Sequence, residues 1–482
     1  MKYNSLTIIY FALLLLIISC SKEEPISTGE ESPTTNLLTS ANTWTKYCGW
    51  HYNNGTSPKW GGWVREYEKN GFGLFITDPG TGLINQSLLE NSYQDLGNLN
   101  SDIDIMQLAG GLGSAKDTTG VINWMNYIEN DHGLKWKDIV YAQSLKLTNL
   151  ADANERVYWQ IGNEISSPSY SKTIRYWQGQ PFGDGIPYDN FIIPFYVENF
   201  LAPTIEAIDR ASVDAYGQAG KINICLGSLT NASSNSAQTF LSELLNYEIA
   251  GNNSPSLNGK KVSDLIHIIT IHYTVGTAST ADWENILNHY KNYSGTGRIK
   301  GVWSTEEVGI NSALGGAGNL IGSLATFRYL EWAINNGYTS KEVRTNYYGW
   351  NTGDERTTVN TFNQFLYNFI GDRKLSNIPK SSTLINSTHP IEMHSFLTED
   401  NSKRVLAIYP ERAQSQPNTQ ISSIVLKKDF WNYNNEIKPY KYNLNGINLV
   451  NIEIIDSNAQ IELIFSTPIE LDYYSGLIIL TD

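Results

Sequence analysis

Two apolar segments of the chain run into glutamates that could work as a pair. Val157–Ile161 leads into Gly-Asn-Glu at residues 162–164, and a second apolar run, from Gly301, leads into Thr-Glu-Glu at residues 305–307. Two carboxyl groups held close together, one protonated and one ionised, can act as a general acid and a nucleophile. That chemistry requires a fold that brings the two segment ends together.

Short apolar runs alternate with longer helical patterns between residues 42 and 380. Strands are predicted at 103–108, 157–161, 222–226, 265–271, 301–305 and 343–348, with two more near Cys48–His51 and Leu74–Thr77. Helices are predicted at 121–130, 195–211, 237–249, 283–293, 320–335 and 358–370. Strand-then-helix alternation favours parallel βα units. We therefore predict an α/β fold with a (β/α)₈ TIM barrel over residues 42–380.

The pattern changes near residue 381. Short β-rich segments separated by turn residues follow, at 392–397, 404–409, 421–426, 448–455, 460–464 and 477–480. No helical pattern interrupts them, which predicts an antiparallel β-sandwich over residues 381–482. The predicted fold is thus a barrel followed by a C-terminal sandwich.

The barrel prediction makes the two glutamate segments neighbours in space. Catalytic residues of (β/α)₈ barrels stand at the carboxyl ends of the strands. Glu164 follows the fourth predicted strand and Glu306 the seventh, and these strands face each other across the barrel mouth. Hydrolysis of a glycosidic bond with retention needs two carboxyl groups about 5–5.5 Å apart.

These residues resemble a known group. Trp-x-x-Gly-Asn-Glu ending at Glu164, together with Thr-Glu at 305–306, resembles clan A of the retaining glycoside hydrolases. The resemblance implies that Glu164 is the acid/base, that Asn163 binds the sugar 2-hydroxyl and that Glu306 is the nucleophile. Glu307 is the alternative nucleophile, because alternation along a strand turns neighbouring residues to opposite faces. The group needs no cofactor, and no metal-binding spacing such as CxxC or HExxH occurs.

Four further residues are candidates for sugar binding. His272 and Tyr273 end the sixth predicted strand and Trp350 follows the eighth, positions that resemble sugar contacts of the clan. Trp177 lies in a long aromatic-rich insertion at 165–194, of a length that is often functional. Each also has a structural explanation: a core histidine, core aromatic rings, or aromatic rings that pack the insertion onto the barrel.

The substrate class follows from a narrower resemblance. Residues 159–165, the insertion and the trailing sandwich are similar to glycoside hydrolase family 86, which contains β-agarases and β-porphyranases. Families 39, 51 and 79 share much of the pattern. The resemblance implies a retaining hydrolase of β-linked polysaccharides, with an agar- or porphyran-type galactan as one substrate class. The alternative is a non-catalytic surface glycan-binding lipoprotein on a barrel scaffold.

The N-terminus predicts export and lipidation. Lys2 precedes an apolar run at residues 6–18 that ends in Ser19-Cys20, which resembles a bacterial lipobox with Cys20 as the lipidated residue. Residues 1–19 are then a signal peptide and 20–41 a flexible stalk rich in Ser, Thr, Pro and Glu. The alternative is a simple membrane anchor. An acidic cluster after Cys20 resembles the surface-export signal of Bacteroidetes lipoproteins, so we expect an outer-membrane lipoprotein facing outward, beside other glycan-utilisation proteins.

Composition agrees with a glycan partner. The 34 Lys and Arg stand against 48 Asp and Glu, for a net charge of −14, which argues against nucleic-acid binding. Aromatic residues make up 12% of the chain, a level that suits a carbohydrate-facing surface. Of the three cysteines, Cys48 and Cys225 are either buried thiols or a disulfide pair, and both alternatives stay open.

Overall fold

The computed structural model describes residues 42–52, 63–66, 104–109, 136–150, 156–166, 192–230, 232–272, 274, 279–307, 317–347, 353–411, 417–433, 436–443, 446–472 and 475–482. The predicted signal peptide and the whole predicted stalk, with Cys20, lie outside these residues. None of the described helices is both long and apolar enough to cross a membrane.

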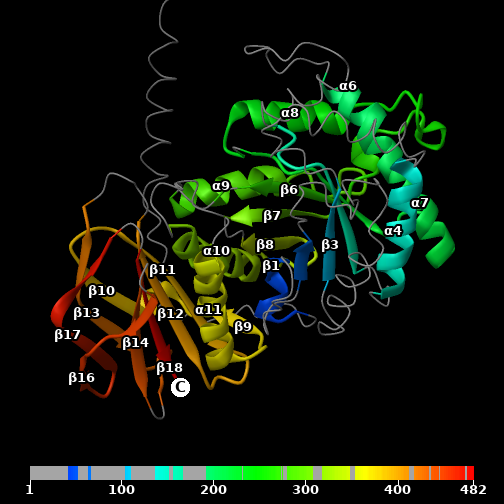
Figure 1. Cartoon of the computed structure of the whole chain (residues 1–482). Helices are drawn as coiled ribbons and strands as arrows, with labels where there is room; N and C mark the ends of the chain where they lie inside the picture. Colours follow the sequence, from blue (N-terminus) through cyan, green and yellow to red (C-terminus); the bar gives the residue numbers. More distant parts are fainter. Residues whose placement is uncertain are drawn as a thin grey trace, which may run out of the picture. The chain divides into compact units, whose positions relative to one another are not determined.

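Eight parallel strands close into a barrel, which confirms the predicted fold class (Figure 1). Each strand pairs with the next, and β8 pairs with β1 to complete the ring. The strands are β1 (Cys48–Tyr52), β2 (Trp63–Glu66), β3 (Asp104–Ala109), β4 (Val157–Ile161), β5 (Asn223–Leu226), β6 (Ile268–His272), β7 (Gly301–Glu307) and β8 (Val343–Tyr347).

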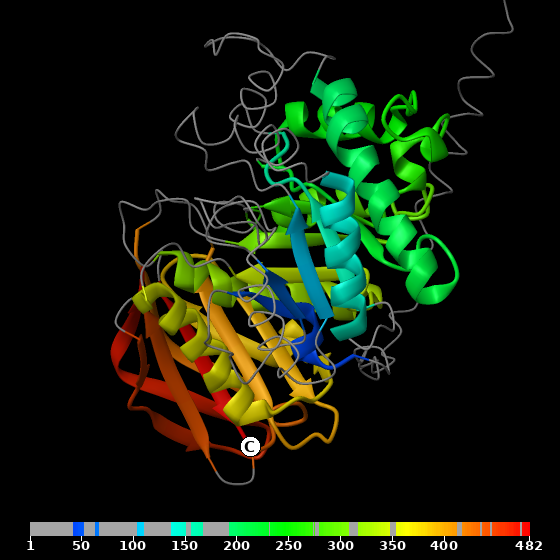
Figure 2. The same cartoon turned by 45° about the vertical axis from the view of Figure 1, so that its right-hand side comes forward.

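Helices pack against the outer faces of these strands. They are η1 (Trp44–Tyr47), α4 (Trp136–Leu150), α6 (Ile192–Tyr196), the π-helical turn η4 (Val197–Leu201), α7 (Ala202–Tyr216), α8 (Asn235–Asn246), η5 (Pro255–Leu257), η6 (Val262–Asp264), α9 (Thr280–Lys291), α10 (Ala317–Asn336) and α11 (Gly353–Ile370). Side-chain caps from Ser234 and Ser279 begin α8 and α9. Helices α4 and α7 lie side by side (Figures 1 and 2).

Of the first two barrel strands, β1 agrees with the strand predicted near Cys48–His51, and the second differs from its prediction. The second strand is β2 at residues 63–66, so its prediction near Leu74–Thr77 is wrong. Only four residues pair there, and two of them, Arg65 and Glu66, are charged, so no apolar run marks the strand. Residues 74–77 and the predicted helix 121–130 lie outside the described part of the chain. Helix α4 was not predicted.

The C-terminal strands form two antiparallel sheets. A four-stranded sheet has the order β10-β13-β17-β16 and a six-stranded sheet the order β15-β14-β18-β12-β11-β9. Their bounds are β9 (Leu375–Asn377), β10 (Thr383–Ser387), β11 (Ile391–Thr398), β12 (Arg404–Pro410), β13 (Thr419–Lys427), β14 (Ile437–Asn443), β15 (Gly446–Leu449), β16 (Glu453–Asp456), β17 (Gln460–Leu471) and β18 (Gly476–Thr481), with η8 (Lys380–Ser382) before β10. The predicted strand 448–455 is two strands, β15 and β16, in different sheets. Strands β9, β10 and β14 were missed.

The barrel interior changes from apolar to polar along its axis. One buried cluster, separate from the core beneath the helices, consists of Trp63, Met106, Tyr158, Cys225, Ile268 and Trp303. The Arg344 guanidinium lies among these rings, 4.4 Å from the Trp303 ring centroid, and pairs with Asp104. Polar residues lie two positions beyond Tyr158, Ile268, Trp303 and Arg344 along the same strands. They are Gln160 of β4, Thr270 of β6, Thr305 of β7 and Asn346 of β8. Because side chains alternate along a strand, these residues share the inward face.

The two cysteines whose pairing the sequence left open lie in different clusters. Cys48 packs in the large core beneath the helices, and Cys225 packs in the interior cluster of the barrel. Both are buried thiols. This agrees with the alternative in which they behave as small apolar residues.

A buried charged group joins α10 to β11 of the six-stranded sheet. Arg328 makes two hydrogen bonds of 2.6 Å to the two carboxylate oxygens of Glu392. The imidazole of His394 contacts Glu392 at 2.8 Å through Nε2 and Glu331 through Nδ1. Burial alone would raise the pKa of Glu392, but the hydrogen bonds from Arg328 and His394 hold it well below its usual range. The group therefore holds α10 against β11 as long as its positive and negative charges compensate each other.

Replacing Arg328 should destabilise the protein strongly. Arg328→Met leaves the buried Glu392 carboxylate without its bidentate partner, which should lower the free energy of unfolding by about 3–5 kcal/mol. Urea denaturation followed by tryptophan fluorescence measures this. Lys428→Met is the matched control: its pair with Asp456 is partly exposed to solvent and should matter little. Equal losses in the two variants would contradict the role of the buried pair.

The same group predicts a pH dependence of stability. Burial lowers the pKa of His394, but the negative charges of Glu331 and Glu392 outweigh burial and raise it above its ordinary 6.5. The stabilisation from the charged imidazole is therefore complete below pH 6.5 and is lost as pH rises through the folded-state pKa. We expect the stability difference between wild type and His394→Gln to shrink from pH 6 to pH 9. A constant difference over that range would show that His394 does not titrate there.

Candidate active site

The turn after β4 holds Glu164 in an unusual backbone conformation. Glu164 has φ of 54°, and Gly162 before it has φ of 86°. The left-handed region costs a non-glycine residue roughly 1 kcal/mol or more, so surrounding contacts must hold it there. The Ile165 amide donates to the Ser228 carbonyl at 2.9 Å, and the Thr230 amide donates to Ser166 Oγ at 3.0 Å. The turn after β4 is thus tied to the segment after β5.

A glycine lets these two segments approach each other. A Cβ built on Gly227 would lie 2.6 Å from the Ile161 carbonyl oxygen and 2.5 Å from Ile165 Cγ2. Real Cβ atoms do not approach backbone this closely, so only glycine fits beside the turn. From the helical side, the Tyr196 hydroxyl donates to the Ile161 carbonyl at 2.7 Å. Contacts from the segment after β5 and from Tyr196 therefore hold the turn that carries Glu164.

A β-bulge in β7 determines which glutamate faces the barrel mouth. Ser304 pairs with Thr345 and Glu307 with Tyr347, so two residues, Thr305 and Glu306, stand opposite the single Asn346 of β8. Trp303 lies in the barrel interior, and strict alternation from it would turn Glu307 inward and Glu306 outward. The extra residue reverses this order. The bulge therefore lets Thr305 and Glu306 face the same side, and both approach His272.

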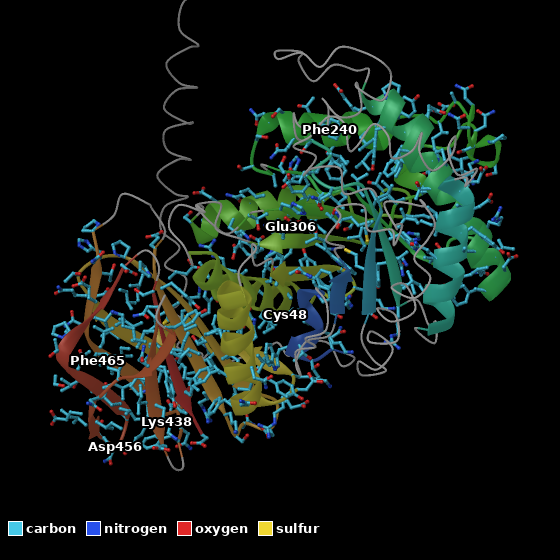
Figure 3. The ribbon with its side chains drawn as sticks, viewed as in Figure 1. Cys48, Phe240, Glu306, Lys438, Asp456 and Phe465 are labelled. Atoms are coloured by element: carbon cyan, nitrogen blue, oxygen red, sulfur yellow. The ribbon has the colours of Figure 1, made fainter. Side chains whose placement is uncertain are left out.

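Glu164, His272 and Glu306 form a compact triangle at the carboxyl ends of β4, β6 and β7. One ligand atom of each residue lies within 4.8 Å of those of the other two. His272 Nδ1 is 3.4 Å from Glu164 Oε1 and 3.6 Å from Glu306 Oε2. The side chains of His272 and Glu306 are buried, while that of Glu164 is 23% exposed. Glu306 lies on β7 in Figure 3.

The separation of the two carboxylates restricts the chemistry they could perform. In retaining glycosidases the carboxyl groups are about 5–5.5 Å apart, whereas inverting enzymes keep about 6.5–9.5 Å to admit a water molecule. A separation within 4.8 Å is too short for that water. The geometry thus suits direct attack by one carboxylate and protonation by the other.

Glu307 has a different environment. Its carboxylate accepts hydrogen bonds from the Thr274 amide at 3.0 Å, from the Ser304 hydroxyl at 2.6 Å and from the Thr274 hydroxyl. Burial, followed by the negative charge of Glu307, raises the pKa of Tyr329 well above its usual range. These contacts lie on the outer side of β7. Glu307 is a buried structural carboxylate, and Glu306 is the one of the two that lies with Glu164 at the barrel mouth.

Beneath the triangle lies a set of polar residues that the sequence analysis did not single out. Thr305 Oγ1 is 3.0 Å from His272 Nε2 and 2.8 Å from Ser228 Oγ, and Gln160 Nε2 is 2.8 Å from the same Ser228 Oγ. Gln160 also lies 3.3 Å from Asn163 Oδ1. A signal was available: Gln160 and Thr270 are polar residues at inward positions of otherwise apolar strands.

Three predicted sugar contacts lie outside the described residues. These are Tyr273, Trp350 and Trp177, so their roles stay predictions. Asn163, directly before Glu164, is buried, and its role in sugar binding also stays a prediction.

The triangle of Glu164, His272 and Glu306 is also the only group of three His, Cys, Asp or Glu side chains in the described part of the chain with the spacing of a cation site. Two carboxylates and one imidazole are acceptable ligands for several divalent metals. A two-carboxylate glycosidase does its chemistry without one. That the site works without a metal ion therefore stays a prediction, which activity assays in EDTA can test.

Comparison with known proteins gives only distant likenesses. No family model and no curated protein matches the chain. Among solved structures it is similar to a glucosidase from Croceicoccus marinus, at 9% identity and a TM-score of 0.48, over 92% of this chain and 97% of that chain. It is also similar to a GH51 α-L-arabinofuranosidase from Thermotoga petrophila, at 10% identity and a TM-score of 0.45, over 88% of both chains.

A third similar structure is a glycoside hydrolase family 5 protein from Bacteroides vulgatus, at 10% identity and a TM-score of 0.39. The match covers 90% of this chain and 89% of that chain. At such identities and TM-scores, the reaction of this chain has to be argued from its own site.

Substitution of the two neighbouring glutamates should separate their roles. Glu307→Gln leaves buried donors without their carboxylate and should lower the free energy of unfolding by about 1–3 kcal/mol, while the folded protein keeps activity of the same order. Glu306→Gln should retain the fold and lose activity. Thermal unfolding and specific activity measure the two effects. An inactive Glu307→Gln beside an active Glu306→Gln would reverse the assignment.

Proposed function

We propose that the protein is a retaining glycoside hydrolase that works by double displacement, with Glu306 as nucleophile and Glu164 as acid/base. The observation that carries the proposal is the pair of carboxylates within 4.8 Å at the ends of β4 and β7. The buried imidazole of His272, which faces both carboxylates, supports it. Asn163, beside Glu164, is proposed to bind the sugar 2-hydroxyl.

The proposed reaction has two steps that balance. First, Glu306 attacks the anomeric carbon while Glu164 gives its proton to the departing glycosidic oxygen, which forms a glycosyl ester on Glu306. Second, Glu164 takes a proton from water, whose oxygen attacks the anomeric carbon and releases Glu306. Repulsion between like charges favours the proton on Glu164 while Glu306 is ionised, and this repulsion disappears once Glu306 is esterified.

The substrate and the location are proposed from sequence resemblance. A polysaccharide with β-linkages is proposed as substrate, and the resemblance to family 86 makes agar- and porphyran-type galactans the first to test. Tyr273, Trp177 and Trp350 are proposed to contact the sugar. The lipobox at Cys20 and the acidic residues after it support tethering to the outer membrane, with the barrel outside the cell and beside other glycan-utilisation proteins.

A panel of polysaccharides tests the proposal directly. The purified protein, assayed in EDTA with agarose, porphyran and other β-linked glycans, should cleave at least one and should form product with retained anomeric configuration, visible by proton NMR. Glu164→Gln should lose about 100- to 10,000-fold in rate, because general acid catalysis contributes about that much. Glu306→Gln should lose at least as much.

Glu243→Gln serves as the matched control, because Glu243 is an exposed glutamate of α8 outside the site. Its activity should equal that of wild type. Full activity of Glu164→Gln or Glu306→Gln would overturn the site assignment, and inverted product would overturn the mechanism. Binding of a glycan without cleavage would favour the alternative, a glycan-binding lipoprotein on a barrel scaffold.

A further inference from the structure

A continuous line of buried polar side chains runs from the barrel interior to the two carboxylates. Its members are Gln160 of β4, Ser228 after β5, Thr305 of β7 and His272 of β6, all fully buried. The contacts between successive members measure 2.8, 2.8 and 3.0 Å, from Gln160 Nε2 to His272 Nε2. His272 Nδ1 then faces Glu164 and Glu306.

The first members of the line have a defined hydrogen-bond direction. Gln160 Nε2 is 3.0 Å from the Gly162 carbonyl, which can only accept, so this end of the amide is the donor. Ser228 Oγ therefore accepts from Gln160. The hydroxyl of the neighbouring Thr270 donates to the Leu226 carbonyl. Ser228 Oγ has two hydroxyl neighbours, Thr270 Oγ1 at 3.1 Å and Thr305 Oγ1 at 2.8 Å. We assign its hydrogen to the shorter contact, with Thr305, which then gives its own hydrogen to His272 Nε2.

The other end of the line requires the same direction. An ionised carboxylate only accepts hydrogen bonds, so the nitrogen that faces Glu164 and Glu306 is stabilised when it carries a proton. The opposite order, in which Nε2 donates to Thr305, would direct the lone pair of Nδ1 at negative oxygen atoms. Both ends thus favour one tautomer.

We propose that Gln160, Ser228 and Thr305 are positioning residues that hold His272 as the neutral Nδ1–H tautomer, whose single N–H serves both carboxylates in turn. This inference rests on the proposed function. Before the reaction Glu306 is ionised, and a small shift from the observed 3.6 Å brings its Oε2 within hydrogen-bond distance of the N–H. In the glycosyl ester Glu306 is neutral, Glu164 is ionised, and the same N–H can turn to Glu164 because the two oxygens lie at similar distances, 3.6 and 3.4 Å.

His272 keeps its proton through both steps in this scheme. It stabilises whichever carboxylate is negative, and no proton leaves the imidazole. The buried line beneath it supplies a hydroxyl donor to Nε2, so the ring has no need to rotate or to exchange tautomers. Loss of that hydroxyl should therefore affect the reaction more than substrate binding.

Nitrogen-15 NMR of histidine-labelled protein tests the tautomer without any substrate. The His272 signals, identified by their absence from His272→Asn, should show a protonated Nδ1 and an unprotonated Nε2. In Thr305→Val, which keeps the β-branched shape, the Nε2 signal should shift, and Thr305→Ser should restore it. Thr204→Val is the control, because the buried Thr204 hydroxyl donates to a helix carbonyl away from the site. A protonated Nε2 in wild type would overturn the proposal.

Kinetics on a glycan that the protein cleaves provides the second readout. Thr305→Val should lower kcat about tenfold with KM within about twofold, a loss that one buried hydrogen bond can account for. Thr305→Ser should recover most of kcat, and Ser228→Ala should show a smaller loss. Unchanged kcat in Thr305→Val would overturn the positioning role. If wild type cleaves no glycan, the proposed function fails, while the NMR result still decides the tautomer.

Discussion

The extra residue in β7 is the local constraint on which the candidate site depends. Two residues of β7 stand opposite one of β8, so Thr305 and Glu306 face the same side and both approach His272, while Glu307 faces away. A regular strand would exchange the two glutamates: the inward carboxylate would be the one now bonded to Thr274 and Ser304, and Glu306 would face the helices. The chemistry proposed for the mouth of the barrel therefore depends on one backbone irregularity.

The bulge acts together with a layered barrel interior. Aromatic rings and the Arg344 guanidinium fill the lower part of the barrel, and a polar layer with Gln160, Ser228 and Thr305 separates them from the carboxylates. The apolar layer supplies burial, while the polar layer offers hydrogen bonds in fixed directions to the groups above. Glu164 adds a second local constraint, because its left-handed backbone persists only through the contacts between the turns after β4 and β5.

The two sheets after residue 374 are joined to the barrel by more than chain connectivity. Arg328 and Glu331 of α10 meet Glu392 and His394 of β11 in a buried group whose charges compensate one another. Isolated buried charges would be unfavourable, so α10 and β11 each need the other to compensate their buried charges. Helix α10 follows β7 in sequence, which connects this group through one βα unit to the strand that carries Glu306.

The sequence alone was enough for the fold class, for seven of the eight barrel strands to within about three residues, and for the two segment ends that carry Glu164 and Glu306. Periodicity and parallel-strand topology suffice for that, because apolar alternation is local and the strand ends of a barrel meet at one mouth. Only the tertiary structure decided the position of β2, the separation of β15 from β16, the choice of Glu306 over Glu307 at the mouth and the hydroxyl line beneath His272. Each of these depends on pairing between strands distant in sequence. A four-residue strand with two charges, a bulge, or hydrogen bonds that lead from β4 through Ser228 to β7 leave almost no local signal in the chain.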